Sequence, residues 1–288
     1  MANTLGTDSL RRKYFKSALQ SALRTSVVAE QICKVDRSDL NYIANPYITA
    51  QAATIQAKAG TYTPAAMTVT NDSLTVTDEV WTSTHVFDFE TLTAEFNLTA
   101  DFLEDLAAQT LIGVDKLVLN WILTDGTGAY TTPAGGFTTS ANISVIMANL
   151  LSKVAGYQGI AMGKGSNYFL VIENTDLVGF MQTQVSSGYA YADAALNYGF
   201  MPNYMGVDVY VVRSGTFVTD TLGSKAVVGS GHRVFGVKNT ALYASPRGVR
   251  YEEKPVTGKT GMEVVAIALC GVKLWTPLAG LIVDITLA

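Results

Sequence analysis

Few residues in this sequence could carry out chemistry, and they are not arranged in a catalytic pattern. The chain has two histidines, His85 and His232, and two cysteines, Cys33 and Cys270, all distant from one another in the sequence. A metal site needs several such ligands at close spacing, and a general base needs a partner within hydrogen-bond reach. The sequence places no such group beside these four residues. We therefore expect no enzyme activity, no catalytic residue, no metal site and no cofactor, and we expect the cysteines to be buried.

Three glycine-containing fragments resemble parts of functional motifs without completing them. Gly258-Lys259-Thr260 matches the end of a phosphate-binding loop, but Glu253 occupies the position of that loop's first glycine. Gly229-Ser230-Gly231 lacks the third glycine of a dinucleotide-binding fingerprint. Asp125-Gly126-Thr127-Gly128 has the residues of an aspartic protease turn in the wrong order. A glycine that ends a helix explains Gly126 better.

The distribution of charge is the most informative feature. Between Lys58 and Lys116 the chain has ten carboxylates and no Lys or Arg (Asp72, Asp78, Glu79, Asp88, Glu90, Glu95, Asp101, Glu104, Asp105 and Asp115). From Lys225 to Lys273 it has eight Lys or Arg against three Glu, an excess of five positive charges. The acidic stretch cannot be neutralised by its neighbours in sequence. We expect its counter-charge on another copy of the protein, with pairing inside the same chain as the alternative.

The composition indicates a folded protein with extensive contact surfaces. Of the 288 residues, 48% are hydrophobic and only 15% are charged, against roughly 25% in a typical protein. The net charge of −4 does not favour nucleic-acid recognition as the primary function. The apolar stretch Met262 to Ile285 is interrupted by charged residues and Pro277, so we expect no membrane span. No signal peptide is expected either, because charged and polar residues interrupt the segment after Arg11-Arg12-Lys13.

The N-terminal region predicts a basic amphipathic helix from Ser9 to Gln31. Apolar residues recur every four positions (Phe15, Leu19, Leu23 and Val27). The other side has five cations (Arg11, Arg12, Lys13, Lys16 and Arg24). This side is either a solvated helix face or a docking face for an acidic partner.

Residues 46–90 predict a long β-hairpin. Thr68 to Thr77 alternates around a turn expected at Asn71-Asp72-Ser73, and Val80 to Phe89 is expected to return as a strand. Two-stranded ribbons are marginally stable in water unless they lie on something. Such an arm needs a surface to cover.

The rest of the chain predicts mixed helices and strands. A long helix is expected from Ala100 to Leu123, capped by Thr99, and a second from Ala141 to Ala155. A third, short helix is expected from Thr175 to Gln184. The expected strands are Tyr168 to Ile172, Val207 to Val212, Ala226 to Val228, Val234 to Val237, Val249 to Val256, Met262 to Leu274 and Leu281 to Leu287.

This order of elements, with the long helix leading through Leu119-Asn120-Trp121 to Asp125-Gly126-Thr127-Gly128, resembles the major capsid protein of tailed phages. The resemblance covers essentially the whole chain and implies the α+β Hong Kong 97-like fold. It implies an N-terminal arm at 1–48 and an extended β loop at 49–90. The peripheral domain, with its long spine helix, would comprise 91–136 and 242–272. The axial domain would comprise 137–241 and 273–288.

The resemblance also implies a function. The chain would be a coat protein that assembles with itself as hexamers and pentamers into an icosahedral virion shell, built in the host cytoplasm. Its other partners would be a separate scaffolding protein, a portal, in some cases a decoration protein, and non-specifically bound double-stranded DNA, with no membrane. The alternatives are an encapsulin-type nanocompartment, or a soluble enzyme or binding domain that uses Tyr189 to Tyr204.

The charge pattern and this resemblance together predict contacts between subunits. An acidic loop on one subunit that lies over a basic hairpin of the next is a heterologous contact, and repeating it closes a ring. Charge complementarity guides encounter and register, while buried apolar area stabilises the assembly. The candidate contact residues are Lys58, Asp72, Asp78, Glu79, Asp88, Arg247, Arg250 and Lys254.

Overall fold

The computed structural model describes residues 27–38, 42–48, 55, 60, 68–86, 98–157, 167–186, 203–246, 248–256 and 260–288. Most of the predicted N-terminal helix lies outside these ranges, and so do the candidate contact residues Lys58, Asp88 and Arg247. Most of the Tyr189–Tyr204 region also lies outside them.

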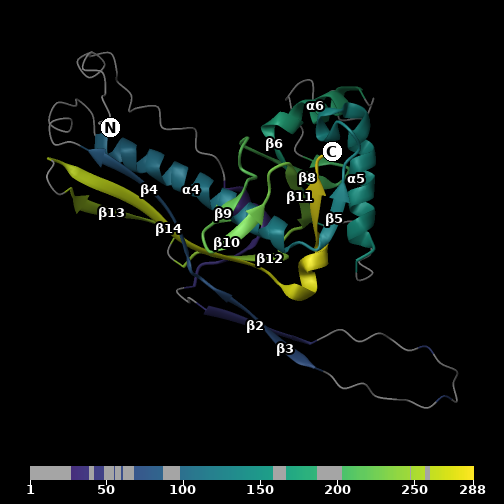
Figure 1. The fold of residues 1–288 in the computed structure, drawn as a ribbon, viewed down its shortest axis with the longest axis horizontal. Helices are drawn as coiled ribbons and strands as arrows, with labels where there is room; N and C mark the ends of the chain where they lie inside the picture. Colours follow the sequence, from purple (N-terminus) through teal and green to yellow (C-terminus); the bar gives the residue numbers. More distant parts are fainter. Residues whose placement is uncertain are drawn as a thin grey trace.

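A single long helix, α4 (Leu98–Asp125), connects the two halves of the molecule (Figure 1). Its 28 residues give a length of about 42 Å. One side of the helix is buried, including Leu106, Thr110, Val114 and Val118. The helix ends where the amide of Gly126 donates to the carbonyl of Ile122. The part from 105 to 125 is long and apolar enough to cross a membrane, but it is mostly buried inside the structure, as expected of a core helix.

The first sheet lies along the N-terminal half of α4. Its order is β1-β12-β14-β13, and β4 pairs with β14 as well. The bounds are β1 Lys34–Asp36, β4 Asp78–Val86, β12 Ala241–Ala244, β13 Val249–Pro255 and β14 Met262–Leu274. Val264 and Ala266 of β14 pack with Leu106 of α4, so one face of this sheet is covered by the helix. β4 lies in the stretch predicted to be extended loop, yet it is a nine-residue strand that belongs to this sheet.

The second sheet lies between helices on both faces. Its order is β5-β15-β11-β6-β8-β7. The bounds are β5 Gly128–Thr131, β6 Tyr168–Glu173, β7 Asn203–Tyr204, β8 Val207–Val212, β11 His232–Val237 and β15 Ile282–Thr286. Alternate residues point to opposite faces of a strand. Leu170 and Phe235 therefore pack with α5 (Ser140–Ala155) and α6 (Leu177–Ser186), whereas Phe169 and Val234 join the core that includes α4.

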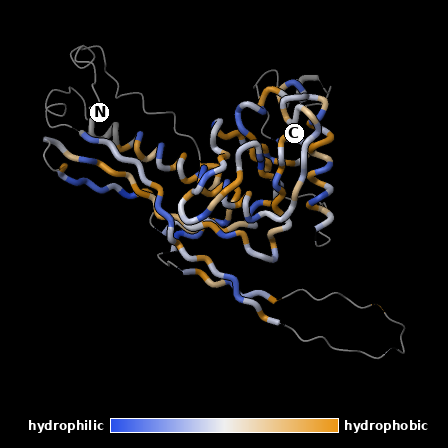
Figure 2. Tube along the Cα trace, viewed as in Figure 1, coloured by the Kyte–Doolittle hydropathy of each residue, from blue (hydrophilic) through white to orange (hydrophobic). Residues whose placement is uncertain are grey.

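Shorter elements complete the body. β9 (Thr219–Leu222) and β10 (Lys225–Val228) form a hairpin that contacts α4. Three 3-10 helices lie in connections: η1 (Gly136–Thr138), η2 (Asn174–Asp176) and η3 (Thr276–Leu281). Figure 2 shows hydrophobic residues along α4 and the strands beside it, which is where the core lies.

The extended arm is built differently from the predicted hairpin. β3 (Val69–Thr75) runs straight through the expected turn at Asn71-Asp72-Ser73, and its partner is β2 (Tyr42–Ile48). The predicted turn is therefore wrong, and β2 was not predicted. Pro46 obscured β2, because proline lacks an amide donor and is confined to edge strands. In a two-stranded ribbon each strand is an edge, so Pro46 is accommodated opposite Asn71.

The predicted N-terminal helix does not continue unbroken to Gln31. Val27 is extended, with φ −68° and ψ 113°, and a separate short helix, α2 (Val28–Ile32), begins after it. Its buried side chains, among them Ala29 and Ile32, belong to the core that α4 also lines. The packing of α2 on α4 explains why the backbone is extended at Val27. The buried side chains of α2 must point toward α4.

Candidate subunit contact surfaces

The base of the β2–β3 ribbon is tied to its own chain through Asp72. Its carboxylate lies 3.0 Å from the Lys273 ammonium and accepts hydrogen bonds from the amide and the hydroxyl of Thr276, at 3.0 and 2.9 Å. Burial raises the pKa of Asp72, but these donors outweigh it and hold the pKa below its ordinary value. Leu74 also packs against Leu242 at this point. The ribbon therefore leaves the body in a defined direction.

Asp78 also finds its partners inside the chain. Its carboxylate accepts from the amide and hydroxyl of Ser224, at 2.7 and 3.1 Å, and from the hydroxyl of Thr77 at 3.0 Å. These bonds hold the turn between β9 and β10, where Gly223 has a φ of 62°. Asp72 and Asp78 were expected to meet a counter-charge on another copy. In the structure, both carboxylates already have partners in their own chain.

The ribbon exposes large apolar side chains along its length. Tyr42, Ile48 and Val69 are exposed, Val69 to 67%. Ile55, between the two strands in sequence, is 98% exposed. Figure 1 shows the ribbon projecting away from both sheets. Such ribbons are marginal in water, and no described residue covers this apolar surface.

A second candidate surface is the face of β13, β14 and β4 that points away from α4, here called the outer face. Directly opposed residues of an antiparallel pair share a face. Trp81, Ile267 and Arg250 form one row across the three strands. A second row holds Lys254, Glu263 and His85. Trp81 is 61% exposed. The outer face therefore combines an exposed aromatic ring with a rim of charges.

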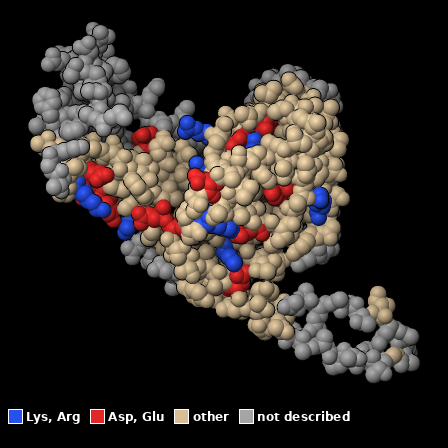
Figure 3. Space-filling view, in the orientation of Figure 1, with Lys and Arg blue, Asp and Glu red and all other residues tan. Residues whose placement is uncertain are grey.

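Three candidate contact residues, Glu79, Arg250 and Lys254, lie on the outer face. Arg250 and Lys254 both contact Glu252, at 3.3 and 3.0 Å. Lys254 foremost holds the pKa of Glu252 below its ordinary value. Glu79 is exposed and has no ion pair with any described residue. Two cations thus share one carboxylate here, and Figure 3 shows acidic and basic side chains close together on this part of the molecule.

The other described cations of the 225–273 segment are also paired within the chain. Lys225 pairs with Asp125, and Lys238 lies 2.6 Å from Asp208. Arg233 is buried between Glu173 and Asp176. Most of the positive charge between Lys225 and Lys273 is therefore paired within the chain, which was the alternative to pairing between copies. Arg250 and Lys254 are paired as well, but they share the single carboxylate of Glu252, and their side chains are 41% and 62% exposed.

Asn120 is a key residue that the sequence analysis did not single out. It is fully buried on α4. Its amide donates to the carbonyls of Lys116 and Thr216, at 2.7 and 2.8 Å, and its oxygen accepts from the amide of Val218 at 3.1 Å. Its position as a polar residue within the apolar run Val118 to Leu123 was the sequence signal that could have identified it. Asn120 ties the 213–218 connection to the central helix.

Glu173 holds the same connection from the second sheet. Its carboxylate accepts from the amides of Gly215 and Phe217, at 3.0 and 3.3 Å, and contacts Arg233. The 213–218 connection is therefore bonded both to α4 and to β6. Together with the packing of α4 against both sheets, this joins the two halves through buried, satisfied polar groups.

The reactive side chains form no catalytic set in the described part of the chain. His232 lies 2.7 Å from Asp284, between neighbouring strands, and His85 stands opposite Glu263. Both cysteines are buried, as predicted, and burial raises the pKa of Cys270 to about 12. Among the described residues, no three His, Cys, Asp or Glu side chains cluster as a metal site would require.

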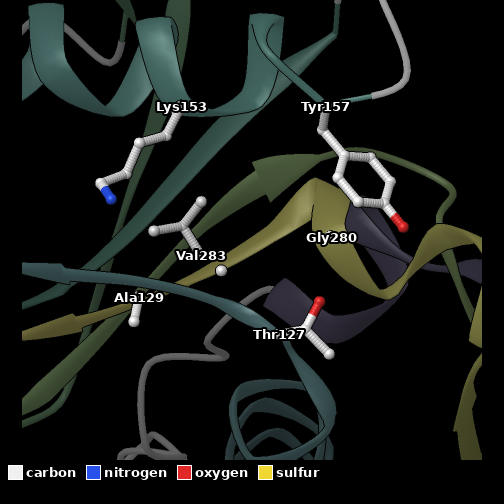
Figure 4. A pocket seen from close by; sticks show the side chains of 7 residues that line it. Thr127, Ala129, Lys153, Tyr157, Gly280 and Val283 are labelled. Carbon is white, nitrogen blue, oxygen red and sulfur yellow. The ribbon is translucent and has the colours of Figure 1, made fainter.

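A hollow of about 320 Å³ lies between the end of α5 and strands β5 and β15 (Figure 4). Lys153, Tyr157 and Thr127 are among the side chains that line it, and Lys153 is the only charged residue of the lining. The Tyr157 hydroxyl donates to the carbonyl of Pro277 at 3.5 Å. The described residues that line the hollow include no paired acid and base.

Comparisons with known proteins identify the fold. No family model matches the sequence, and no curated protein matches it. The capsid structure of cyanophage P-SCSP1u superposes with a TM-score of 0.71 at 13% identity, covering 100% of this chain and 97% of that one. A structure from Mycobacterium phage Che8 gives 0.71 at 15%, covering 93% and 94%. The capsid of a native GTA particle gives 0.68 at 14%, covering 100% and 99%. The chain therefore has the α+β fold of these capsid structures, as the sequence predicted.

Proposed function

We propose that this chain is the major capsid protein of a tailed phage. The observation that carries the proposal is a likeness to capsid structures along nearly the whole length of both chains. The projecting apolar ribbon supports it, because the described body leaves that surface bare. The role is structural and non-enzymatic, in a virion shell assembled in the host cytoplasm.

The surfaces fit repeated contact between identical copies. The ribbon of one subunit lies over the outer face of the next, where its apolar side chains cover Trp81. Glu79, Arg250 and Lys254 set the register at the rim of this contact. A heterologous contact of this kind closes into rings when its rotation allows, which gives hexamers and pentamers. Lys58, Asp88 and Arg247 remain candidate contacts.

The presence of two separate sheets supports a division into a peripheral and an axial domain. We assign 1–48 to an N-terminal arm and 49–90 to an extended loop. The peripheral domain is 91–136 with 242–272, and the axial domain is 137–241 with 273–288. β4 pairs with the peripheral sheet and β5 with the axial sheet, so these two strands favour moving the boundaries to about 77 and 126.

Other partners follow from the same role. A separate scaffolding protein, a portal and a decoration protein are proposed partners, and double-stranded DNA is enclosed without specific recognition. The overall charge of −4 suits a container that releases its contents, because an acidic wall binds phosphates weakly.

The experiment is production of the full-length chain followed by size-exclusion chromatography and negative-stain microscopy. Five- and six-membered rings or closed megadalton shells are expected. Purification from infected cells separates the phage head from an encapsulin compartment, because only the head encloses phage DNA. A chain that stays a 30.8 kDa monomer at high concentration would contradict the proposal.

A further inference from the structure

The end of the central helix contains the single Asp-Gly step of the chain. Asp125 is the last residue of α4 and Gly126 follows it, and the sequence has no other Asp-Gly and no Asn-Gly. Asp-Gly is the aspartyl sequence most open to isomerisation, because glycine has no side chain to keep its amide away from the preceding carboxyl group. The proposed function makes no use of this step.

The isomerisation is an intramolecular condensation followed by hydrolysis. The amide nitrogen of the glycine forms a bond to the side-chain carbonyl carbon of the aspartic acid, and the carboxyl OH leaves with the amide proton as water. The product is a cyclic succinimide. Water then opens the ring at either carbonyl, which restores aspartate or gives isoaspartate, whose main chain is longer by one carbon.

The structure engages the attacking amide in the last turn of α4. The N–H of Gly126 donates to the carbonyl of Ile122 at 3.0 Å and to that of Leu123 at 3.3 Å. Asp125 belongs to the helix, and helical backbone directs the next amide back toward those carbonyls. Attack on the carboxyl group therefore requires that these hydrogen bonds break and that the backbone of Asp125 leaves the helical conformation.

The carboxylate of Asp125 is held in its ion pair with Lys225. The Lys225 ammonium lies 5.7 Å from the centre of the Trp121 ring, and the indole N–H of Trp121 donates to the carbonyl of Leu222 at 3.1 Å. The side chains of Asp125 and Lys225 are 32% and 27% exposed, so water reaches the pair only in part. An ion pair requires an ionised carboxylate, which is a poor electrophile because it has no OH to lose as water.

Packing explains why a glycine stands at this vulnerable position. A Cβ on residue 126 would lie 2.9 Å from the Cγ2 of Ile282 and 3.2 Å from its carbonyl oxygen. Ile282 begins β15 and is fully buried. Replacing Gly126 would therefore displace β15, and the restraint on the reaction has to come from the contacts around the step.

We propose that Asp125-Gly126 is a latent isomerisation site, which the end of α4 and Lys225 together hold unreacted. Isoaspartate would lengthen the main chain between α4 and β5, directly before the point where the amide of Thr127 donates to the carbonyl of Ala279 at 3.1 Å. The modification would therefore loosen the connection between the central helix and the second sheet. This inference does not depend on shell assembly.

The test is peptide mapping of the full-length chain aged at neutral pH, with separation of the aspartyl and isoaspartyl forms of the peptide that contains Asp125. Ageing in heavy-oxygen water identifies the succinimide route, because ring opening leaves an oxygen from water in either product. Lys225→Gln should raise the rate of isoaspartate formation by about threefold or more, the factor expected for loss of a partly exposed ion pair. Lys238→Gln is the matched control, because it removes another lysine–aspartate pair, and Asp208 is followed by Val209. It should leave the rate at Asp125 unchanged.

The wild-type chain in guanidinium chloride gives a second comparison that needs no variant. Unfolding releases the Gly126 amide, so isoaspartate should form on the order of 10-fold faster than in the folded chain. Equal rates in the folded and unfolded wild type would overturn the protection by the helix end. Equal rates in the wild type and in a Lys225→Gln variant with an unchanged circular dichroism spectrum would overturn the role of Lys225. If that variant does not fold, the comparison of folded and unfolded wild type decides the matter.

Discussion

At the scale of single residues, Asn120 shows how one buried polar side chain organises its surroundings. All three of its hydrogen bonds go to backbone groups, two of them on the 213–218 connection. A Cβ on Gly229 would lie 2.1 Å from the Asn120 oxygen, so only glycine fits at position 229. The Asn120 side chain is therefore tightly packed, and both of its polar atoms have hydrogen-bond partners.

Replacing Asn120 with Leu should therefore destabilise the protein although the two side chains are similar in size. The carbonyl of Thr216 and the amide of Val218 would be left buried without a partner. Each such group costs about 1–3 kcal/mol, so a loss of about 2–6 kcal/mol in the free energy of unfolding is expected. Urea denaturation of the unassembled chain measures it. Asn149→Leu on the exposed side of α5 is the control, and an equal effect of both variants would contradict this account.

At the scale of elements, the ribbon depends on one ion-paired carboxylate for its direction. Asp72 is the only acidic residue of β2 and β3, and it connects β3 to Lys273 at the end of β14 and to Thr276 in η3. Since the two-stranded ribbon has little core of its own, its base must supply the rigidity.

Asp72→Asn should lower thermal stability near pH 7 and flatten its acid dependence. The folded pKa of Asp72 is below its ordinary value, so its contribution is complete above about pH 4 and is lost as the pH falls through the folded pKa. The wild type should therefore lose more stability than the variant between pH 5 and pH 3. Unfolding temperatures measured across this range test the prediction. Parallel pH profiles for the two proteins would show that Asp72 contributes nothing.

At the scale of the whole molecule, assembly should depend on the outer face more than on the fold. Reversal of Arg250 and Lys254 to Glu places two new negative charges beside Glu252 on an exposed strand. Exposed charge pairs contribute little to stability. We therefore expect the double variant to fold with an unchanged circular dichroism spectrum. Its yield of assembled particles should be lower by about tenfold or more.

The control for this double reversal is Lys153→Glu, an exposed residue near the end of α5 in the other half of the molecule. Particle yield from sedimentation, measured at low and high salt, is the readout. Normal shells from the Arg250 and Lys254 double variant would remove these residues from the contact.

The amino-acid sequence alone determined most elements of the body. Apolar periodicity identified α4 and α5, and short runs of strand-forming residues identified β6, β8, β13 and β14. These patterns are local, because they are set by neighbouring residues in the chain. Short strands such as β1, β5 and β12 were missed, since three or four residues are too few to show a period.

Only the tertiary structure decided which charges meet. Asp72 and Lys273 are 201 residues apart in sequence, and no local pattern predicts that β3 and β14 bring them together. The same holds for Asn120 and the connection it binds, and for Asp115 beneath α2. Ion pairs and buried hydrogen bonds depend on short distances between distant segments, whereas hydrophobic periodicity is set by neighbours in the chain. For that reason most helices and strands could be derived from the sequence, and their order carried the resemblance that implied the fold, whereas the residues that lock the fold could not be predicted.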